Sequence, residues 1–118
     1  MGIEPTLVQW LSRQPELADV SVSMDVPQDR PERFVTVERT GGGSTTRGII
    51  GTPTIAVQCW ARTRLEAADL ADTVAGVLGR SIELPQVKRL TINSVANFPL
   101  DETQPRYQIV ADMVTQQS

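Results

Sequence analysis

The fold is decided by residues 33–78, which read RFVTVERT (33–40), GGGSTTRGIIGTP (41–53), TIAVQCWA (54–61) and RTRLEAADLADTVAGVL (62–78). The first and third of these stretches alternate apolar and other side chains with a period of two, which is typical of half-buried strands. The glycine-rich stretch between them has too little apolar mass to order itself and predicts a mobile loop. We therefore expect a β-hairpin with a long loop.

Residues 63–78 predict an amphipathic helix that covers this hairpin. Apolar residues recur every three or four positions and define one stripe, formed by Leu65, Ala68, Ala71, Val74, Ala75 and Leu78. Thr63 is placed to cap the start of the helix, Glu66 completes a capping box, and Gly79 is placed to end the helix in a left-handed turn. Because a helix of this length is marginal alone in water, we expect the stripe to pack on the sheet.

The rest of the chain supplies one more helix and three more strands. Residues 4–12 predict a short first helix, and the alternation over residues 19–26 predicts the first strand. The two prolines in residues 27–31 indicate a turn. Residues 87–98 predict a strand with a bulge where the alternation shifts, and residues 106–114 predict the last strand.

Together these elements predict a single α+β domain over residues 1–118, with a flexible loop at about 41–53. We expect a mainly antiparallel sheet of about five strands with two helices packed on one face. The order along the chain is helix, three strands, helix, two strands. With 118 residues, of which 40% are hydrophobic, the chain is long enough to bury such a core without disulfides or a structural metal.

The residue types argue against catalysis. The sequence contains no histidine, which excludes the Ser–His and Cys–His pairs of many small hydrolases. Its single cysteine, Cys59, lies on an apolar strand face and is interpreted as a small buried hydrophobe. The glycine-rich loop lacks the lysine and hydroxyl of a P-loop, because Ile49 and Ile50 follow Gly48. We therefore expect no enzyme activity and no cofactor or metal.

Three further residues have two interpretations each. Asp69 and Asp72 lie three residues apart on the predicted helix, and we interpret them as part of a solvated acidic face because no third oxygen ligand converges on them. Trp60 ends the second hairpin strand. It is expected either in the core under the helix or as the anchor of an interface.

Charge and hydropathy bound the partners and the compartment. The net charge of −3 argues against nucleic acid as the main partner, because phosphate binding draws its affinity from clustered basic residues. No apolar run approaches the ~18 residues of a membrane span, and nothing at the N-terminus resembles a signal peptide. A single cysteine fits a protein that folds inside a cell.

The glycine-rich loop is the best functional candidate in the sequence. Long loops inside small compact domains are uncommon unless they have a function. Ile49 and Ile50 near its end have no obvious core to enter, so we expect them to pack on a neighbouring subunit.

The run RPERFVTVERTGG (30–42), followed by IAVQCWA (55–61) and an alanine-rich helix, resembles the small neck and tail-terminator proteins of long-tailed bacteriophages. The pattern resembles in particular those encoded by actinobacterial phages and prophages. It covers about residues 27–78 and carries no catalytic signature. The remaining elements fit the family's α+β layout in their order.

The resemblance implies a structural virion protein. Copies of the chain, commonly six, would form a ring that caps the tail tube, stops its polymerisation and joins the tail to the head. The implied partners are further copies, the major tail tube protein and the head–tail connector proteins, with DNA passing through the ring without sequence-specific recognition. The implied location is the tail–neck junction, reached after assembly in the host cytoplasm.

A closed ring needs a heterologous interface, in which two different patches of each subunit meet. We assign one patch to the polar sheet face and the other to the loop over residues 41–51, with Gly41, Gly42, Gly43, Arg47, Ile49 and Ile50. Trp60 is a further interface candidate, as an anchor. Charge partners between copies are expected from Arg39, Arg47, Arg62 and Arg64 on one side and Asp69 and Asp72 on the other. A loop that orders only on assembly would keep the single chain soluble until tail proteins are present.

Two alternatives remain open from the sequence. One is a head-side connector or completion protein of the same phage neck, which shares the size and fold class. The other, from a different class, is a small cytoplasmic binding module that uses the open sheet face for a peptide or a nucleic acid.

Overall fold

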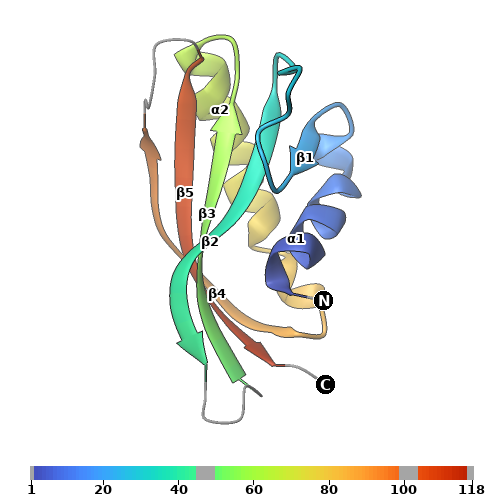
Figure 1. The fold of residues 1–118 in the computed structure, drawn as a ribbon, viewed down its shortest axis with the longest axis vertical. Coiled ribbons are helices and arrows are strands. Elements are labelled where there is room, and N and C mark those ends of the chain that lie inside the picture. The colour runs from blue at the N-terminus through green and yellow to red at the C-terminus, as the bar shows by residue number, and fades with distance from the viewer. Residues whose placement is uncertain (1, 45–49, 99–103, 117–118) are drawn as a thin grey trace.

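The computed structural model describes residues 2–44, 50–98 and 104–116. The elements along the chain are α1 (Ile3–Ser12), the 3₁₀ turn η1 (Pro15–Leu17), β1 (Ser21–Ser23), β2 (Phe34–Ser44), β3 (Ile50–Trp60), α2 (Arg64–Leu78), the 3₁₀ turn η2 (Ser81–Glu83), β4 (Val87–Asn97) and β5 (Arg106–Gln116). Figure 1 shows them as one twisted sheet with both helices on the same side. This confirms the predicted α+β class and the predicted order.

The five strands form one sheet in the order β1-β2-β3-β5-β4. β1 runs parallel to β2, and every other neighbouring pair is antiparallel. β2, β3, β4 and β5 each have 11 residues. The sheet therefore consists of four long antiparallel strands with one short parallel strand at the β2 edge.

Both helices bury their apolar residues against one face of the sheet. α1 packs on β1 and β2, whereas α2 packs on β3, β5 and β4. The core between these layers contains residues from both helices and from alternate strand positions, among them Leu7, Trp10, Leu11, Val35, Val37, Ile55, Val57, Leu70, Val74, Leu78, Ile109 and Met113. Cys59 belongs to this core and is fully buried, as predicted.

The start of α2 is capped as the sequence predicts, but its buried stripe is rotated. The Thr63 hydroxyl accepts a 3.1 Å hydrogen bond from the Glu66 backbone N–H. The buried residues are Ala67, Leu70, Ala71, Val74, Val77 and Leu78. Leu65, with which the predicted stripe began, is 72% exposed, so that prediction was wrong at this position. The physical reason is that Leu70 and Val77 lie two turns apart on the same side of the helix. The stripe that contains them buries more apolar volume than the stripe that contains Leu65.

The end of α2 also differs from the prediction. Gly79 has φ −59° and ψ −24°, which is right-handed helical geometry rather than a left-handed turn. Its N–H donates to Ala75 O, and the next N–H, from Arg80, donates to Val77 O over 2.9 Å. A tightened 3₁₀-type last turn therefore satisfies these carbonyls and leads directly into η2.

The first strand is shorter than its alternation predicts. β1 covers only Ser21–Ser23, whereas the expected strand spanned residues 19–26. After it, the Ser23 hydroxyl donates a 2.6 Å hydrogen bond to Asp25 O, and the chain leaves the sheet edge. Because β1 is parallel to β2, the chain has to return along the sheet before β2 can begin. The residues that return it cannot also belong to the ladder.

The hairpin between β2 and β3 is longer than predicted. Residues 41–44 pair with residues 51–54, so both ends of the expected 41–53 loop are strand. The Thr52 hydroxyl exchanges two 3.2 Å hydrogen bonds with the Gly43 backbone. Backbone pairing needs no apolar side chains, which explains why glycines continue the ladder here. Residues 45–49 of that loop lie outside the described residues.

Two bulges shape β4, and the second lies close to Val95, where the shift in the alternation predicts one. The register with β5 slips between Val87 and Arg89 and again between Ile92 and Ser94. At the second bulge, Asn93 Nδ2 donates to Asp112 Oδ2 over 2.8 Å, and the Thr54 hydroxyl donates to Asp112 Oδ1 over 2.7 Å. These two donors lower the pKa of the Asp112 carboxyl. The three residues tie β4, β5 and β3 together on the sheet face that the helices leave uncovered.

Candidate functional site

The sheet face opposite the helices is buried at one end although no helix covers it. The buried side chains there come from β2, β3 and β5 and are Phe34, Thr36, Ala56, Gln58, Trp60 and Arg106. Residues 24–33, the crossover segment, return the chain from β1 to β2 on this side. Met24, Asp25 and Val26 of this segment line a groove together with four of the buried residues, namely Thr36, Gln58, Trp60 and Arg106. We call this groove the crossover groove.

An aromatic stack forms one end of the crossover groove. The guanidinium groups of Arg30 and Arg106 lie 5.2 Å and 5.0 Å from the ring centre of Trp60. Arg106 also lies 4.9 Å from the ring of Phe98, and its Nε donates to Phe98 O over 3.0 Å. Gln104 holds the crossover segment from the β5 side, donating to Pro31 O. Aromatic rings and planar guanidinium groups therefore fix the crossover segment to the sheet.

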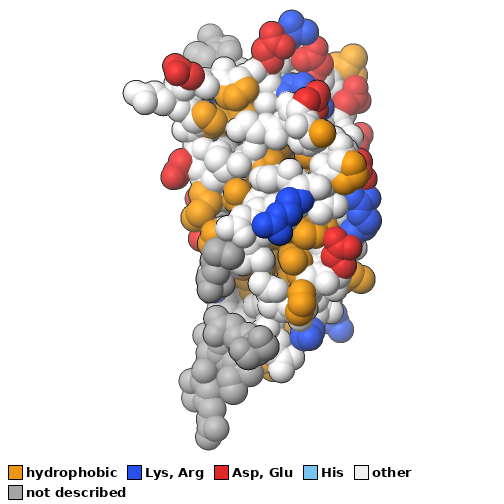
Figure 2. Space-filling view, turned by 90° about the vertical axis from the view of Figure 1, so that its right-hand side faces the viewer, with side chains coloured by type: hydrophobic (Ala, Val, Ile, Leu, Met, Phe, Trp, Pro, Cys, Tyr) orange, Lys and Arg blue, Asp and Glu red, His pale blue; other side chains and the backbone are white. Residues whose placement is uncertain are grey.

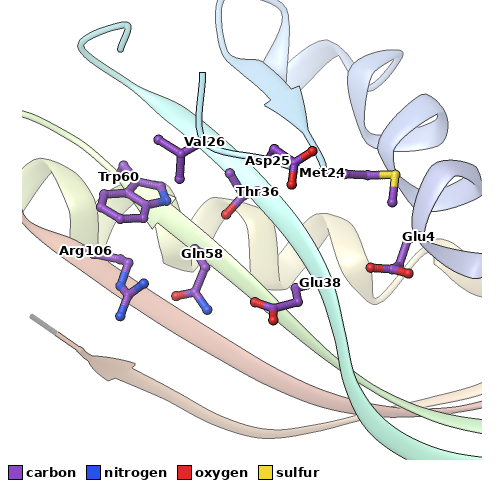
Figure 3. A pocket seen from close by; sticks show the side chains of 9 residues that line it. All are labelled: Glu4, Met24, Asp25, Val26, Thr36, Glu38, Gln58, Trp60 and Arg106. Atoms are coloured by element: carbon purple, nitrogen blue, oxygen red, sulfur yellow. The ribbon is translucent and has the colours of Figure 1, made fainter. Parts of the chain in front are cut away.

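The crossover groove has a volume of about 320 Å³ and is lined by Glu4, Met24, Asp25, Val26, Thr36, Glu38, Gln58, Trp60 and Arg106. Figure 3 shows how these side chains are distributed. Trp60 and Arg106 lie at one end, Gln58 and Thr36 in the middle, and Glu38 and Glu4 at the other end. The groove is therefore polarised along its length, with a cationic and aromatic end and an acidic end.

Three carboxylates give the acidic end its charge. Glu4 Oε2 accepts a 3.0 Å hydrogen bond from the backbone N–H of Arg39, at the edge of β2 beyond β1. Asp25 and Glu38 are exposed, and neither makes an ion pair with any other described residue. In the described part of the chain, no three His, Cys, Asp or Glu side chains are close enough together to hold a metal ion. The negative charge is thus spread over the acidic part of the groove and not gathered at one point.

Two residues that line the crossover groove each carry a buried polar atom with no hydrogen-bond partner among the described residues. These atoms are Gln58 Oε1, an acceptor, and Trp60 Nε1, a donor. Their residues are only 7% and 4% exposed. The other tryptophan differs, because Trp10 Nε1 donates a 2.7 Å hydrogen bond to Glu83 Oε1. An unpartnered buried polar group costs about 1–3 kcal/mol, so two of them in one groove mark it as a candidate binding site.

The residues predicted for an oligomer interface fall into two separate regions. Arg39, Gly41, Gly42, Gly43 and Ile50 lie on the β2–β3 hairpin, whereas Arg62, Arg64, Asp69 and Asp72 lie before and on α2. Figure 1 places the far end of the hairpin and the start of α2 at opposite ends of the molecule. One chain therefore does not bring the two sets together. The predicted residues Arg47 and Ile49 lie outside the described residues.

The predicted charge partners do not behave alike. Arg62 makes ion pairs inside the chain, with Glu66 at 3.2 Å and with Glu32 at 3.7 Å. Arg64 is exposed and makes no ion pair with a described residue, and Asp69 and Asp72 are exposed as expected for a solvated acidic face. Arg64 is therefore better placed than Arg62 to meet a carboxylate of another copy.

Trp60 is buried, as one of its two interpretations expected, but on the other face of the sheet. It lies opposite Cys59 on β3 and stacks on Phe34, so it is not under α2. The sequence places Gln58 and Trp60 on one strand face, and that pattern was the available signal for a second buried surface. It was missed because residues 24–26, which cover this face, read as a continuation of the first strand.

One edge of the sheet, formed by β4, is open. β4 ends the sheet, and among the described residues no strand lies beyond it. Its residues from Asn93 to Asn97 are exposed, and Val95 is 38% exposed.

Figure 2 shows the opposite side of the molecule, where charged side chains of both signs gather at the upper end and hydrophobic ones are scattered. No described helix is long and apolar enough to cross a membrane.

Comparison with known proteins does not assign a family to this chain. Neither models of known protein families nor curated protein sequences match it. The function is therefore inferred from the sheet, its open edge, the hairpin and the crossover groove.

Proposed function

We propose that this chain is a structural subunit of a bacteriophage neck that assembles into a ring, caps the tail tube and joins the tail to the head. Two points support this proposal. Residues 27–78 resemble phage tail-terminator proteins, and the α+β layout is the one which that resemblance implies. The observation that carries it is the β2–β3 hairpin, two 11-residue strands that extend past the helices (Figure 1).

The hairpin and the β4 edge are two different surfaces, as a closed ring requires. The hairpin lies towards one edge of the sheet, whereas β4 is the opposite edge strand. An exposed edge strand offers unpaired backbone groups to another chain. β4 carries only Lys88 and Arg89 as charged residues, both near its start, so little charge opposes pairing along the rest of the strand. Two unlike patches on one subunit favour a heterologous contact, which closes into a ring when the rotation allows.

A head-side connector or completion protein of the same neck is the neighbouring possibility. Both are ring-forming virion proteins that act on the same DNA path. The two differ in what they bind, because a terminator binds the end of a tail tube and a connector binds the head portal. In either case the subunit acts at the tail–neck junction of the virion after assembly in the host cytoplasm.

The test is assembly of the purified chain, alone and with its partner. Light scattering should give a mass that rises with concentration, and electron microscopy should show rings. Addition of polymerising tail tube protein should give rings at one tube end and shorter tubes. A chain that stays monomeric and does not change tube length would overturn the proposal, whereas binding to portals instead of tubes would favour the connector.

A further inference from the structure

We propose that the crossover groove binds a short extended segment of a partner protein that carries an arginine or a lysine. A peptide unit of the segment would lie over Gln58 and Trp60, and its basic side chain would reach the acidic end at Glu38. The proposal concerns the single chain and does not depend on ring formation.

The two unpartnered buried atoms match one peptide unit. A peptide unit presents an N–H donor and a C=O acceptor. Gln58 Oε1 needs a donor and Trp60 Nε1 needs an acceptor, and both residues line the same groove. The two residues are next-but-one neighbours on a single face of β3, so their side chains are about 7 Å apart along the strand. An extended segment along the groove would satisfy both atoms.

The charge of the groove selects the side chain. Beyond Gln58, the lining includes three carboxylates, Glu4, Asp25 and Glu38. They do not converge closely enough to hold a metal ion, whereas a long arginine or lysine side chain contacts spread acceptors through several donors. Arg106 lies at the other end of the groove, beside Trp60 (Figure 3). Its charge would therefore lie near the peptide C=O that accepts from Trp60 and far from the basic side chain of the segment.

The size of the groove limits the occupant. About 320 Å³ is at the lower end of the roughly 300–1,000 Å³ that small-molecule pockets occupy. This space suits one long side chain with its neighbouring peptide units. The segment would then lie on the sheet face between the crossover and the strands.

The two indole N–H groups provide a direct test by NMR. ¹⁵N-labelled protein would be titrated with N-acetyl-arginine N-methylamide, which contains both a peptide unit and a guanidinium group. We expect the Trp60 indole resonance to shift saturably and the Trp10 resonance to stay in place, because Trp10 Nε1 is already bonded to Glu83. The Trp60→Phe variant assigns the two resonances. The matching citrulline compound, which has the same shape without the charge, should bind roughly fivefold more weakly.

Variants separate the two parts of the proposal. Glu38→Gln should weaken the arginine probe by roughly fivefold and leave the citrulline probe unchanged, because only a charged acceptor is lost. Gln58→Met, which keeps the length of the side chain, should weaken both probes. Asp69→Asn changes an exposed carboxylate on α2 and should change neither. An unchanged Trp10 resonance reports that each variant is folded.

Several results would overturn the proposal. The first is that neither probe shifts the Trp60 resonance, and the second is that the two probes bind equally. The third is that Glu38→Gln and Asp69→Asn weaken binding of the arginine probe to the same extent. A Trp60 shift produced by protein concentration alone would show that a second copy fills the groove, which would overturn a foreign partner. A chain that forms no ring but binds the arginine probe would overturn the proposed neck function and leave the proposed peptide site intact.

Discussion

The indole of Trp60 stacks on the ring of Phe34, with 5.2 Å between ring centres and 11° between ring planes. Both residues are buried on the sheet face opposite the helices, where Arg30 of the crossover segment and Arg106 of β5 lie over the Trp60 ring, and neither aromatic residue belongs to the core cluster. This stack is therefore a second apolar cluster, separate from the core beneath α1 and α2. Its stability contribution is measurable by truncation of one ring.

Phe34→Ala should lower the free energy of unfolding by about 3–5 kcal/mol, because it removes a fully buried ring and leaves a cavity. Urea denaturation followed by far-UV circular dichroism measures the change. Trp60→Phe should cost much less, since it keeps an aromatic ring and removes an indole N–H that has no partner among the described residues. A Phe34→Ala variant as stable as the parent would mean that the crossover does not cover this face.

The rotated stripe of α2 gives a matched pair of leucine variants. Leu70→Ala should lower the free energy of unfolding by about 2–5 kcal/mol, because Leu70 is buried in the core. Leu65→Ala should change it by less than about 0.5 kcal/mol, because Leu65 is 72% exposed. Thermal or urea unfolding of the two variants decides between the two stripes. The reverse order would restore the stripe predicted from the sequence.

The sequence predicts the elements that local chemistry controls. The Thr63 cap, the bulged β4 strand and the alternation of β2 and β3 are all visible in short windows. The stripe of α2 was wrong because two apolar lines run along an alanine-rich helix, and the volumes of Leu70 and Val77 decide between them only once the sheet is in place. Propensity alone does not separate such lines.

The groove is not predictable in the same way, because its lining joins residues distant in the chain. Glu4 comes from α1, Asp25 from the crossover and Arg106 from β5, so no local pattern links them. The shortness of β1 is also a tertiary effect. Val20, Val22, Met24 and Val26 alternate well, yet a parallel pairing with β2 ends the strand at Ser23.

The end of the hairpin depends on one glycine. Gly42 has φ +95°, and a Cβ added there would lie 2.1 Å from the carbonyl oxygen of Thr52 on the facing strand. Gly42→Ala should therefore lower the free energy of unfolding by about 1–3 kcal/mol, or separate the strands beyond this point. Gly41→Ala is the control, because no atom lies within 4 Å of its added Cβ. Hydrogen exchange at residues 41–44 and 51–54 measures the opening, and equal exchange in the two variants would contradict the close approach.

The ion pair between Glu16 and Arg80 predicts an acid-sensitive contribution to stability. Arg80 donates to both carboxylate oxygens of Glu16, at 2.6 Å and 2.9 Å. These hydrogen bonds lower the pKa of Glu16 from its ordinary 4.5 to about 2. A depressed folded-state pKa stabilises the fold above about pH 4.5, and that contribution is lost as the pH falls towards 2.

Glu16→Gln tests this contribution because it keeps the shape and removes the titration. The parent should exceed the variant in stability at neutral pH, and the difference should shrink between pH 4.5 and about pH 2. Urea unfolding at a series of pH values measures it. Asp69→Asn, which removes the same charge from an exposed site without an ion pair to a described residue, is the control for the loss of charge alone. A constant difference between the parent and Glu16→Gln would contradict the role of the pair.

The proposed ring places a contact between copies at the open edge of β4. Phe98 N–H donates to Arg106 O, so the alternation of an antiparallel ladder turns the N–H of Val95 towards the free edge. Proline is tolerated at such positions of an edge strand, but it cannot donate to an added strand. Val95→Pro should therefore leave the single chain folded and weaken its self-association, whereas Val95→Thr should associate like the parent.

Light scattering gives the association, and the circular dichroism spectrum with the Trp10 indole resonance reports the fold of each variant. Rings that persist in a folded Val95→Pro variant would exclude pairing at the β4 edge and leave the hairpin and the α2 surface as the contacts. Loss of the ring together with loss of the Trp10 resonance would mean that the substitution unfolds the chain. In that case Val95→Lys, which keeps the backbone N–H and adds charge at the edge, replaces it, and parent-like association of this variant would likewise exclude the β4 edge.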